Sequence, residues 1–99
     1  MLLITGTFRI APASFTEALP VMARMVAASR AEEGCLDYSY AADLLEPGLI
    51  RVSERWRDQD TLDAHMASDH LNEWRATWPA LNIHARDLTV HDVADSRPA

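Results

Sequence analysis

The order in which two hydrophobic periodicities follow one another restricts the fold more than any other feature. Apolar residues recur at every second position, the period of a half-buried strand, in segments 2–10, 35–42, 49–56 and 84–93. Helical spacing fills the intervals before the second and the fourth of these segments. The order strand, helix, strand, strand, helix, strand favours an α+β, ferredoxin-like βαββαβ fold. Its four-stranded antiparallel sheet carries the helices on one face.

Local signals mark the first helix and the central hairpin. The run Ser14 to Glu17 matches a capping box, so we expect Ser14 to cap the first helix. Pro20 removes one backbone hydrogen bond and predicts a bend near 16–20, and Gly34 ends the helix. A turn at Glu46-Pro47-Gly48 joins the second and third strands.

The second helical interval contains two stripes with separate start signals. Asp58 or Asp60 can cap the first stripe, which carries Leu62, His65 and Met66. Ser68 or Asp69 can cap a continuation that Pro79 closes and that carries Leu71, Trp74 and Trp78.

The amount of apolar sequence predicts a homodimer. Hydrophobic residues make up 48% of only 99 residues, more than a small monomer easily buries. The sheet has one face without helices, and we expect packing of a second copy to cover residues Leu3, Cys35, Leu49 and Val93. Residues 1–93 are predicted to form a single domain, with 94–99 as a flexible tail.

Composition excludes several classes of function. Nine Arg, no Lys and fifteen acidic residues give a net charge of −6, which argues against nucleic-acid binding, Schiff-base chemistry and P-loop phosphate binding. The single Cys35 excludes an intramolecular disulfide and a thiolate metal cluster. No apolar run is long enough to span a membrane, so we expect a cytoplasmic protein with no membrane partner.

His65 and Trp56 are the predicted catalytic residues. His65 shares the apolar stripe of its helix, should face the sheet, and titrates near neutral pH, as a general base must. The alternative is a core histidine satisfied by one hydrogen bond, with Glu54 as the candidate partner. Trp56 ends the third strand, where it either lines a pocket or fills the space between layers.

Further residues are predicted to contact a substrate. They are Tyr38, Tyr40, Glu54, Met66, His70 and Trp74. Tyr38 and Tyr40 share one strand face, where a phenol could donate a hydrogen bond or simply pack. A buried Glu54 requires a partner, either His65 or an Arg. Arg75 is expected to point to solvent.

His70 lies five residues after His65, about 140° around a continuous helix. The two rings can share a metal only if the helix breaks at Ser68-Asp69. We therefore predict no metal site, and His70 as a structural or rim donor near the start of the following helix.

Two motifs resemble one known family. Glu33-Gly34-Cys35-Leu36-Asp37-Tyr38 resembles the Gly-Cys step that leads into the family's second strand. A second motif resembles the strand-to-helix signature of the antibiotic biosynthesis monooxygenase domain family. It consists of Glu54-x-Trp56 followed by Leu62, His65, Ser68 and His70. The likeness spans residues 2–92 and implies a dimeric α+β barrel.

The resemblance also implies an activity. Characterised members oxygenate anthrones or quinols without flavin, heme or metal, so we expect a cofactor-independent monooxygenase acting on a small aromatic substrate. Two alternatives stay open: a non-catalytic dimeric ligand-binding module, and a heme-binding or heme-degrading protein. The heme-degrading branch uses an Asn on the first strand, where this chain has Thr5 and Thr7, and anthrone oxygenases use one near the position of Val52.

Overall fold

The predicted order of elements is confirmed by the structure, a computed structural model that describes residues 1–99. A short 3-10 turn (Pro12–Ser14) precedes the first helix, and the second helical interval is divided into three helices. The elements are β1 (Leu2–Arg9), α1 (Phe15–Arg30), β2 (Cys35–Ala42), β3 (Leu49–Trp56), α2 (Gln59–Met66), α3 (Asp69–Ala76), α4 (Trp78–Leu81) and β4 (His84–Asp92). None of these helices combines the length and apolar character needed to cross a bilayer.

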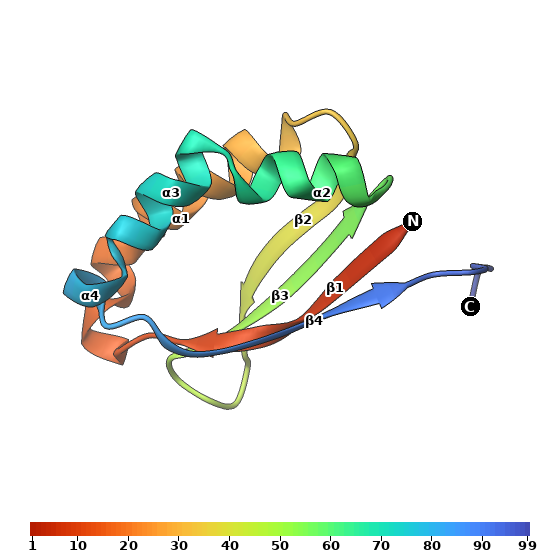
Figure 1. The fold of residues 1–99 in the computed structure, drawn as a ribbon. Coiled ribbons are helices and arrows are strands. Elements are labelled where there is room, and N and C mark those ends of the chain that lie inside the picture. The colour runs from red at the N-terminus through yellow and green to blue at the C-terminus, as the bar shows by residue number, and fades with distance from the viewer.

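The four strands form one antiparallel sheet in the order β2-β3-β1-β4. The helices lie across one face of this sheet, and the opposite face carries none (Figure 1). This is the ferredoxin-like arrangement that the sequence predicts. Residues 94–99 continue beyond β4 as exposed chain without helix or strand.

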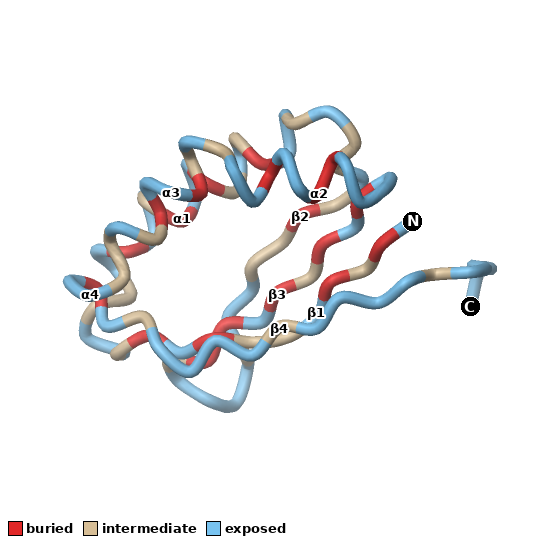
Figure 2. Tube along the Cα trace, viewed as in Figure 1, coloured by how far each residue is buried: buried red, intermediate tan, exposed pale blue.

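The hydrophobic core lies between the sheet and the helices. Leu2, Ile4 and Phe8 of β1 are buried beneath the helices, as are Ile50 and Trp56 of β3, so the predicted alternation is confirmed on both central strands. Buried positions concentrate on these strands and on the inner faces of the helices, whereas β4 is mostly exposed (Figure 2). On the face that the helices cover, the sheet is therefore buried mainly along β1 and β3 and exposed along β4.

A bulge at the start of β2 reverses the faces predicted for its first residues. The register shifts between Cys35 and Asp37, so that Cys35 pairs with Trp56 and packs against the core. Leu36, which alternates with Tyr38 and Tyr40 along the sequence, is 50% exposed. Strict alternation fails here because a bulge inserts one unpaired residue into the ladder.

The helix starts follow the predictions only in part. Asp58 caps α2 through a capping box with Thr61, and Ser68 caps α3. The predicted cap at Ser14 is wrong: its backbone is already helical and its side chain makes no capping hydrogen bond, because the 3-10 turn runs directly into α1. Pro20 lies inside α1, which continues to Arg30.

The helix-free face of the sheet is more polar than expected. Leu49 is buried, Cys35 turns inward through the bulge, and only Leu3 and Val93 of the four predicted contact residues stay half-buried outside the core. A shallow concavity on this face is lined mainly by small or polar residues, among them Thr5, Thr7, Ser39, Arg51 and Ser53.

Candidate active site

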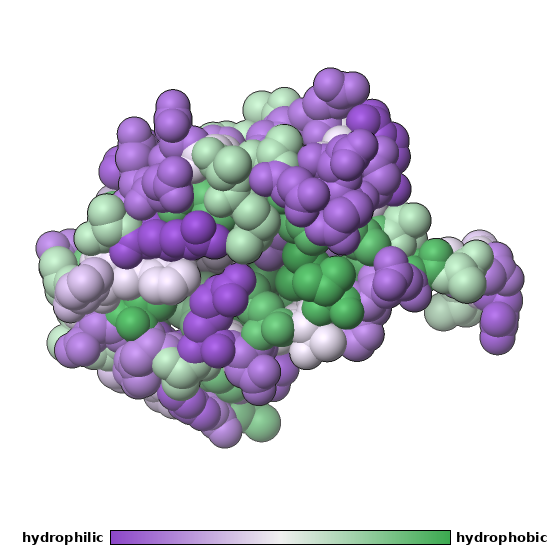
Figure 3. Space-filling model, in the orientation of Figure 1, coloured by the Kyte–Doolittle hydropathy of each residue, from purple (hydrophilic) through white to green (hydrophobic).

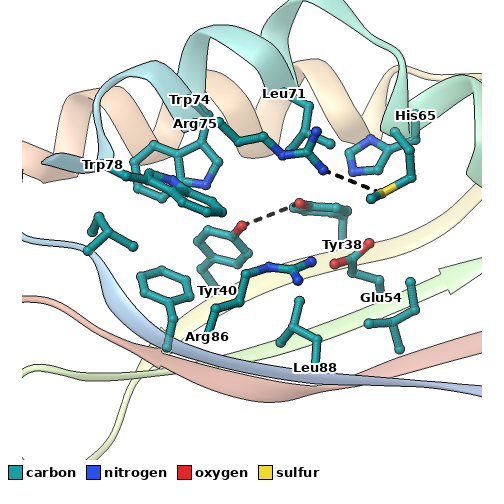
Figure 4. A pocket seen from close by; sticks show the side chains of 14 residues that line it. Tyr38, Tyr40, Glu54, His65, Leu71, Trp74, Arg75, Trp78, Arg86 and Leu88 are labelled. Atoms are coloured by element: carbon teal, nitrogen blue, oxygen red, sulfur yellow. Dashed lines mark hydrogen bonds between the residues drawn. The ribbon is translucent and has the colours of Figure 1, made fainter.

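A cavity lies between the helices and the sheet, and ten of its fourteen lining residues are hydrophobic. Strands supply its floor and helices α2, α3 and α4 supply its roof (Figure 4). Six of the eight predicted site residues line it: Tyr38, Tyr40, Glu54, His65, Met66 and Trp74. Trp56 packs behind His65, and His70 lies outside the cavity.

The free space inside the cavity is about 30 Å³, enough for on the order of one or two water molecules. Its mouth lies along the seam between the helices and β4, where Figure 3 shows apolar atoms at the surface beside hydrophilic side chains. Met66 is 41% exposed there, and Arg75 Nη2 lies 3.9 Å from its Sδ. Both side chains are long and flexible, so an aromatic ligand would enter by displacing them.

His65 is held at the cavity wall by a carboxylate and two aromatic rings. It is 2% exposed, its ring centroid lies 4.6 Å from that of Trp56, and its Nδ1 lies 2.7 Å from Glu32 Oε1. An ionised carboxylate only accepts, so Nδ1 carries the proton and donates it. The structure contains no hydrogen bond to Nε2, which keeps its lone pair.

The charge state of His65 follows from burial. Burial lowers the pKa of this imidazole below its ordinary 6.5, and the Glu32 carboxylate offsets only part of that effect. The ring is therefore neutral at pH 7. A neutral ring with its proton fixed on Nδ1 can accept a proton at Nε2, as a general base does.

The predicted pairing of His65 with Glu54 is wrong, because Glu32 takes that place. Glu32 lies in the turn between α1 and β2, 33 residues before His65, and no periodicity connects the two. The only sequence motif near Glu32 was Glu33-Gly34-Cys35, which follows it directly and gave no indication of a contact with His65. Gly34 has a φ of +80°, and a Cβ there would lie 2.3 Å from a Thr61 carbon, so this turn packs tightly against α2.

Glu54 is instead held by Trp56 and faces Arg86. Its Oε1 accepts a hydrogen bond from Trp56 Nε1 at 3.0 Å, and the residue is 4% exposed. Burial raises the pKa of this carboxyl, and the Trp56 hydrogen bond and the charge of Arg86 oppose the rise. Figure 4 shows Arg86 extending across the cavity toward Glu54. The expectation that a buried carboxylate here needs a partner is met by the Trp56 indole, with the charge of Arg86 acting from further away.

Replacing Glu54 by Gln should change how stability depends on pH. With a folded-state pKa above the unfolded one, the wild type loses stability as pH rises from the unfolded pKa through the folded pKa. Glu54→Gln lacks this loss, so its stability relative to wild type should increase with pH, by up to about 1.4 kcal/mol per pH unit in that window. Urea unfolding from pH 4 to 8 measures the difference, and a constant or decreasing one contradicts it.

Tyr38 and Tyr40 place two phenols side by side in the cavity. Their hydroxyl oxygens lie 3.4 Å apart, and Tyr38 is 1% exposed. Burial raises the pKa of both phenols, so both remain protonated donors at neutral pH. Trp74 lies against Tyr40, with ring centroids 6.3 Å apart, and closes the cavity from above.

Two arginines also line the cavity, although neither was predicted to lie there. Arg75, expected in solvent, is half-buried there, and Arg86 reaches in from β4. The signal for Arg86 was available, because it alternates with Leu88 on a strand whose Leu88 faces inward. Together they bring positive charge to a cavity within an acidic protein.

His70 lies near the start of α3, as predicted, but it does not line the cavity as a substrate contact. The helix is interrupted between α2 and α3, with Ser68 as the N-cap of α3. The angle of about 140° expected for a continuous helix therefore does not apply to the two histidines. His70 Nε2 contacts Glu32 Oε1, and the centroids of the His65 and His70 rings are 5.9 Å apart. His65, His70 and Glu32 thus form one cluster, and their donor atoms lie close enough together to hold a metal ion.

Known proteins share this fold. A Deinococcus radiodurans structure, provisionally assigned as an antibiotic biosynthesis monooxygenase, is 21% identical, with a TM-score of 0.92 over 100% of this chain and 98% of its own. Rv0793 from Mycobacterium tuberculosis is 26% identical, with a TM-score of 0.76 over 99% of this chain and 97% of its own. An uncharacterised Synechocystis protein, sll1783, is 23% identical over 96 residues; this chain covers 65% of its length, and the match spans 97% of this chain.

Two further comparisons concern the family itself. A solved structure described as an antibiotic biosynthesis monooxygenase is 30% identical, with a TM-score of 0.77 over 99% of this chain and 100% of its own. The sequence profile of the family described as antibiotic biosynthesis monooxygenase matches residues 1–77. This chain therefore belongs to the antibiotic biosynthesis monooxygenase family.

Proposed function

We propose that this protein is a monooxygenase that oxidises a quinol- or anthrone-like aromatic with O₂ and requires no bound cofactor. The observation that carries the proposal is the neutral His65, whose Nδ1 is held by Glu32 while Nε2 stays free at an aromatic-lined cavity. Family membership supports the reaction class, and the substrate class comes from the chemistry that such a cavity can perform.

The first step is removal of a substrate proton by His65 Nε2, which leaves a phenolate or enolate. This anion is electron-rich enough to pass one electron to O₂, and the two radicals combine through a new C–O bond. The resulting peroxide takes up one proton. The C–H bond of the carbon that bears the peroxide then breaks, and its electron pair forms a C=O bond as the O–O bond breaks. The outer oxygen leaves as water with that hydrogen, and the other oxygen remains on the substrate. His65 returns the proton that it removed.

The residues facing His65 suit an anionic intermediate. Tyr38 and Tyr40 remain protonated and can donate hydrogen bonds to the enolate oxygen, and Arg86 supplies positive charge. Such donors act strongly in a cavity that excludes water. Glu54 stays engaged by the Trp56 indole and adds its charge to the electrostatics of Arg86.

A panel of paired substrates tests the proposal. Oxygen consumption is followed with a naphthohydroquinone and with an anthrone, and the control is the dimethyl ether of the same hydroquinone, which has no acidic proton. We expect saturable uptake with a substrate and none with the ether, and one ¹⁸O atom from ¹⁸O₂ in the product. Uptake at the buffer rate without incorporated ¹⁸O across the panel would favour the non-catalytic binding module instead.

Replacing Glu32 by Gln should alter the pH profile. Only the neutral ring accepts a proton, so kcat/KM should rise with pH through the His65 pKa and level off above it. The Glu32 charge raises that pKa, so Glu32→Gln should move the rise to lower pH. The plateau should fall at least about tenfold, because an amide can also donate to Nδ1 and no longer fixes the tautomer. A rise shifted to higher pH contradicts this assignment.

We also propose that the protein works as a homodimer formed through the helix-free face of the sheet. The uncovered face and its shallow concavity support this arrangement. Sedimentation at micromolar concentration should give twice the chain mass, and a stable monomer would contradict it.

A further inference from the structure

We propose that Glu32, His65 and His70 form a binding site for one divalent transition-metal ion of the Zn²⁺ type, and that metal bound there switches off the base. The site lies behind His65, since neither Glu32 nor His70 lines the cavity. The switch rests on the proposed function, whereas metal binding itself does not.

Three separate parts of the fold converge on this site. Glu32 comes from the turn after α1, His65 from α2 and His70 from α3, and their donor atoms lie within 4.8 Å of one another. The convergence depends on the break at Ser68, whose Oγ donates to His65 O at 2.6 Å and accepts from Leu71 N to begin α3. A continuous helix would have turned the two imidazoles apart.

The donor set indicates the kind of metal. Two imidazole nitrogens and one carboxylate oxygen suit Zn²⁺, and also Cu²⁺ and Ni²⁺, whereas Mg²⁺ and Ca²⁺ prefer oxygen donors alone. Ligands bonded at about 2.0–2.1 Å around a tetrahedral ion lie roughly 3.3 Å apart. The separations here fall on both sides of that value: His65 Nδ1 and Glu32 Oε1 are 2.7 Å apart, and all three donor atoms lie within 4.8 Å of one another.

The burial of the cluster fits a site with three protein ligands and an open position. The side chain of His65 is 2% exposed, that of Glu32 15% and that of His70 24%. The His65 side is dry, and the His70 side can admit water as a fourth ligand.

A metal ion here would change which nitrogen of His65 carries the proton. Binding requires the lone pair of Nδ1, so the proton of the neutral ring moves to Nε2. The Nε2 at the cavity then carries hydrogen and cannot accept a proton from substrate. The same ring therefore serves either the metal or the reaction, and metal binding is expected to inhibit oxygenation.

Spectroscopic titration tests the site without any substrate. Untagged, chelator-treated protein is titrated with CoCl₂, followed by its visible absorption bands, and with ZnCl₂ by calorimetry. We expect one ion per chain, with affinity on the order of 100-fold weaker in His70→Ala and in Glu32→Gln. His84→Ala is the matched control, an exposed histidine outside the cluster, and should bind as the wild type does. Circular dichroism verifies that each variant is folded.

The outcomes separate the site from the proposed reaction. Absence of binding by the wild type, or equal affinity in wild type and His70→Ala, overturns the metal site. Binding with the proton still on His65 Nδ1 in ¹⁵N NMR spectra, or with oxygen uptake unaffected, overturns the switch. If no substrate is ever oxidised, the proposed function fails, and the cobalt titration still decides whether the site exists.

Discussion

Replacing His65 by alanine is expected to lower kcat/KM for a quinol or anthrone substrate by about two to four orders of magnitude. The variant loses the only neutral imidazole at the cavity, and with it the group that removes the substrate proton. It also leaves a space beside Trp56, so added imidazole should restore part of the activity. Oxygen uptake at saturating O₂ measures both effects.

Two variants distinguish loss of the base from loss of structure. His65→Gln keeps a donor for Glu32 and much of the packing, yet it cannot act as a base and should be as inactive as His65→Ala. His84→Ala should retain wild-type kcat/KM, since His84 lies outside the cavity. Activity of His65→Gln within threefold of wild type would remove His65 from the mechanism and leave the buried Glu54 carboxylate as the candidate base.

Replacing Trp56 by alanine is expected to lower the free energy of unfolding by about 3–5 kcal/mol. Trp56 is 0% exposed, packs on His65 and Tyr38, and donates its indole N–H to Glu54. The loss is a large part of the roughly 5–15 kcal/mol that stabilises a typical domain. Urea unfolding followed by circular dichroism measures it.

The indole hydrogen bond can be separated from packing with two Phe variants. Trp56→Phe leaves Glu54 buried without its donor and should cost about 1–3 kcal/mol beyond the packing term. Trp78→Phe is the matched control, because the Trp78 Nε1 is buried without a hydrogen-bond partner. Equal losses of stability in the two variants would show that the Trp56–Glu54 hydrogen bond contributes nothing.

The fold could be predicted because each element carries its own periodicity. The alternation of β1 and β3 and the helical stripes predicted the core, and they also predicted that His65, Tyr38 and Glu54 lie on the inner face. Periodicity failed where a local event interrupts it, as at the bulge beside Cys35 and at the turn before α1.

The partners of the site residues could not be predicted in the same way. Glu32 reaches His65 through the folding of a turn onto a helix, and the angle between His65 and His70 depends on how far the chain turns at Ser68. Arg75 was predicted to point to solvent because its neighbour Trp74 lies on the buried stripe of the helix. The buried side of the helix is wide enough to include part of Arg75 as well. Such contacts depend on tertiary packing, which no spacing along the sequence encodes.

The proton position on the His65 ring is the most direct test of the account. Two-bond ¹H–¹⁵N NMR spectra of metal-free protein at pH 7.5 report which ring nitrogen is protonated, and addition of a non-oxidisable anthraquinone shows which nitrogen senses the ligand. The account predicts a neutral ring with the proton on Nδ1 and a resonance of Nε2 that shifts on binding. A proton on Nε2, or an Nε2 resonance that the ligand leaves unchanged while those of the cavity aromatics move, would contradict it.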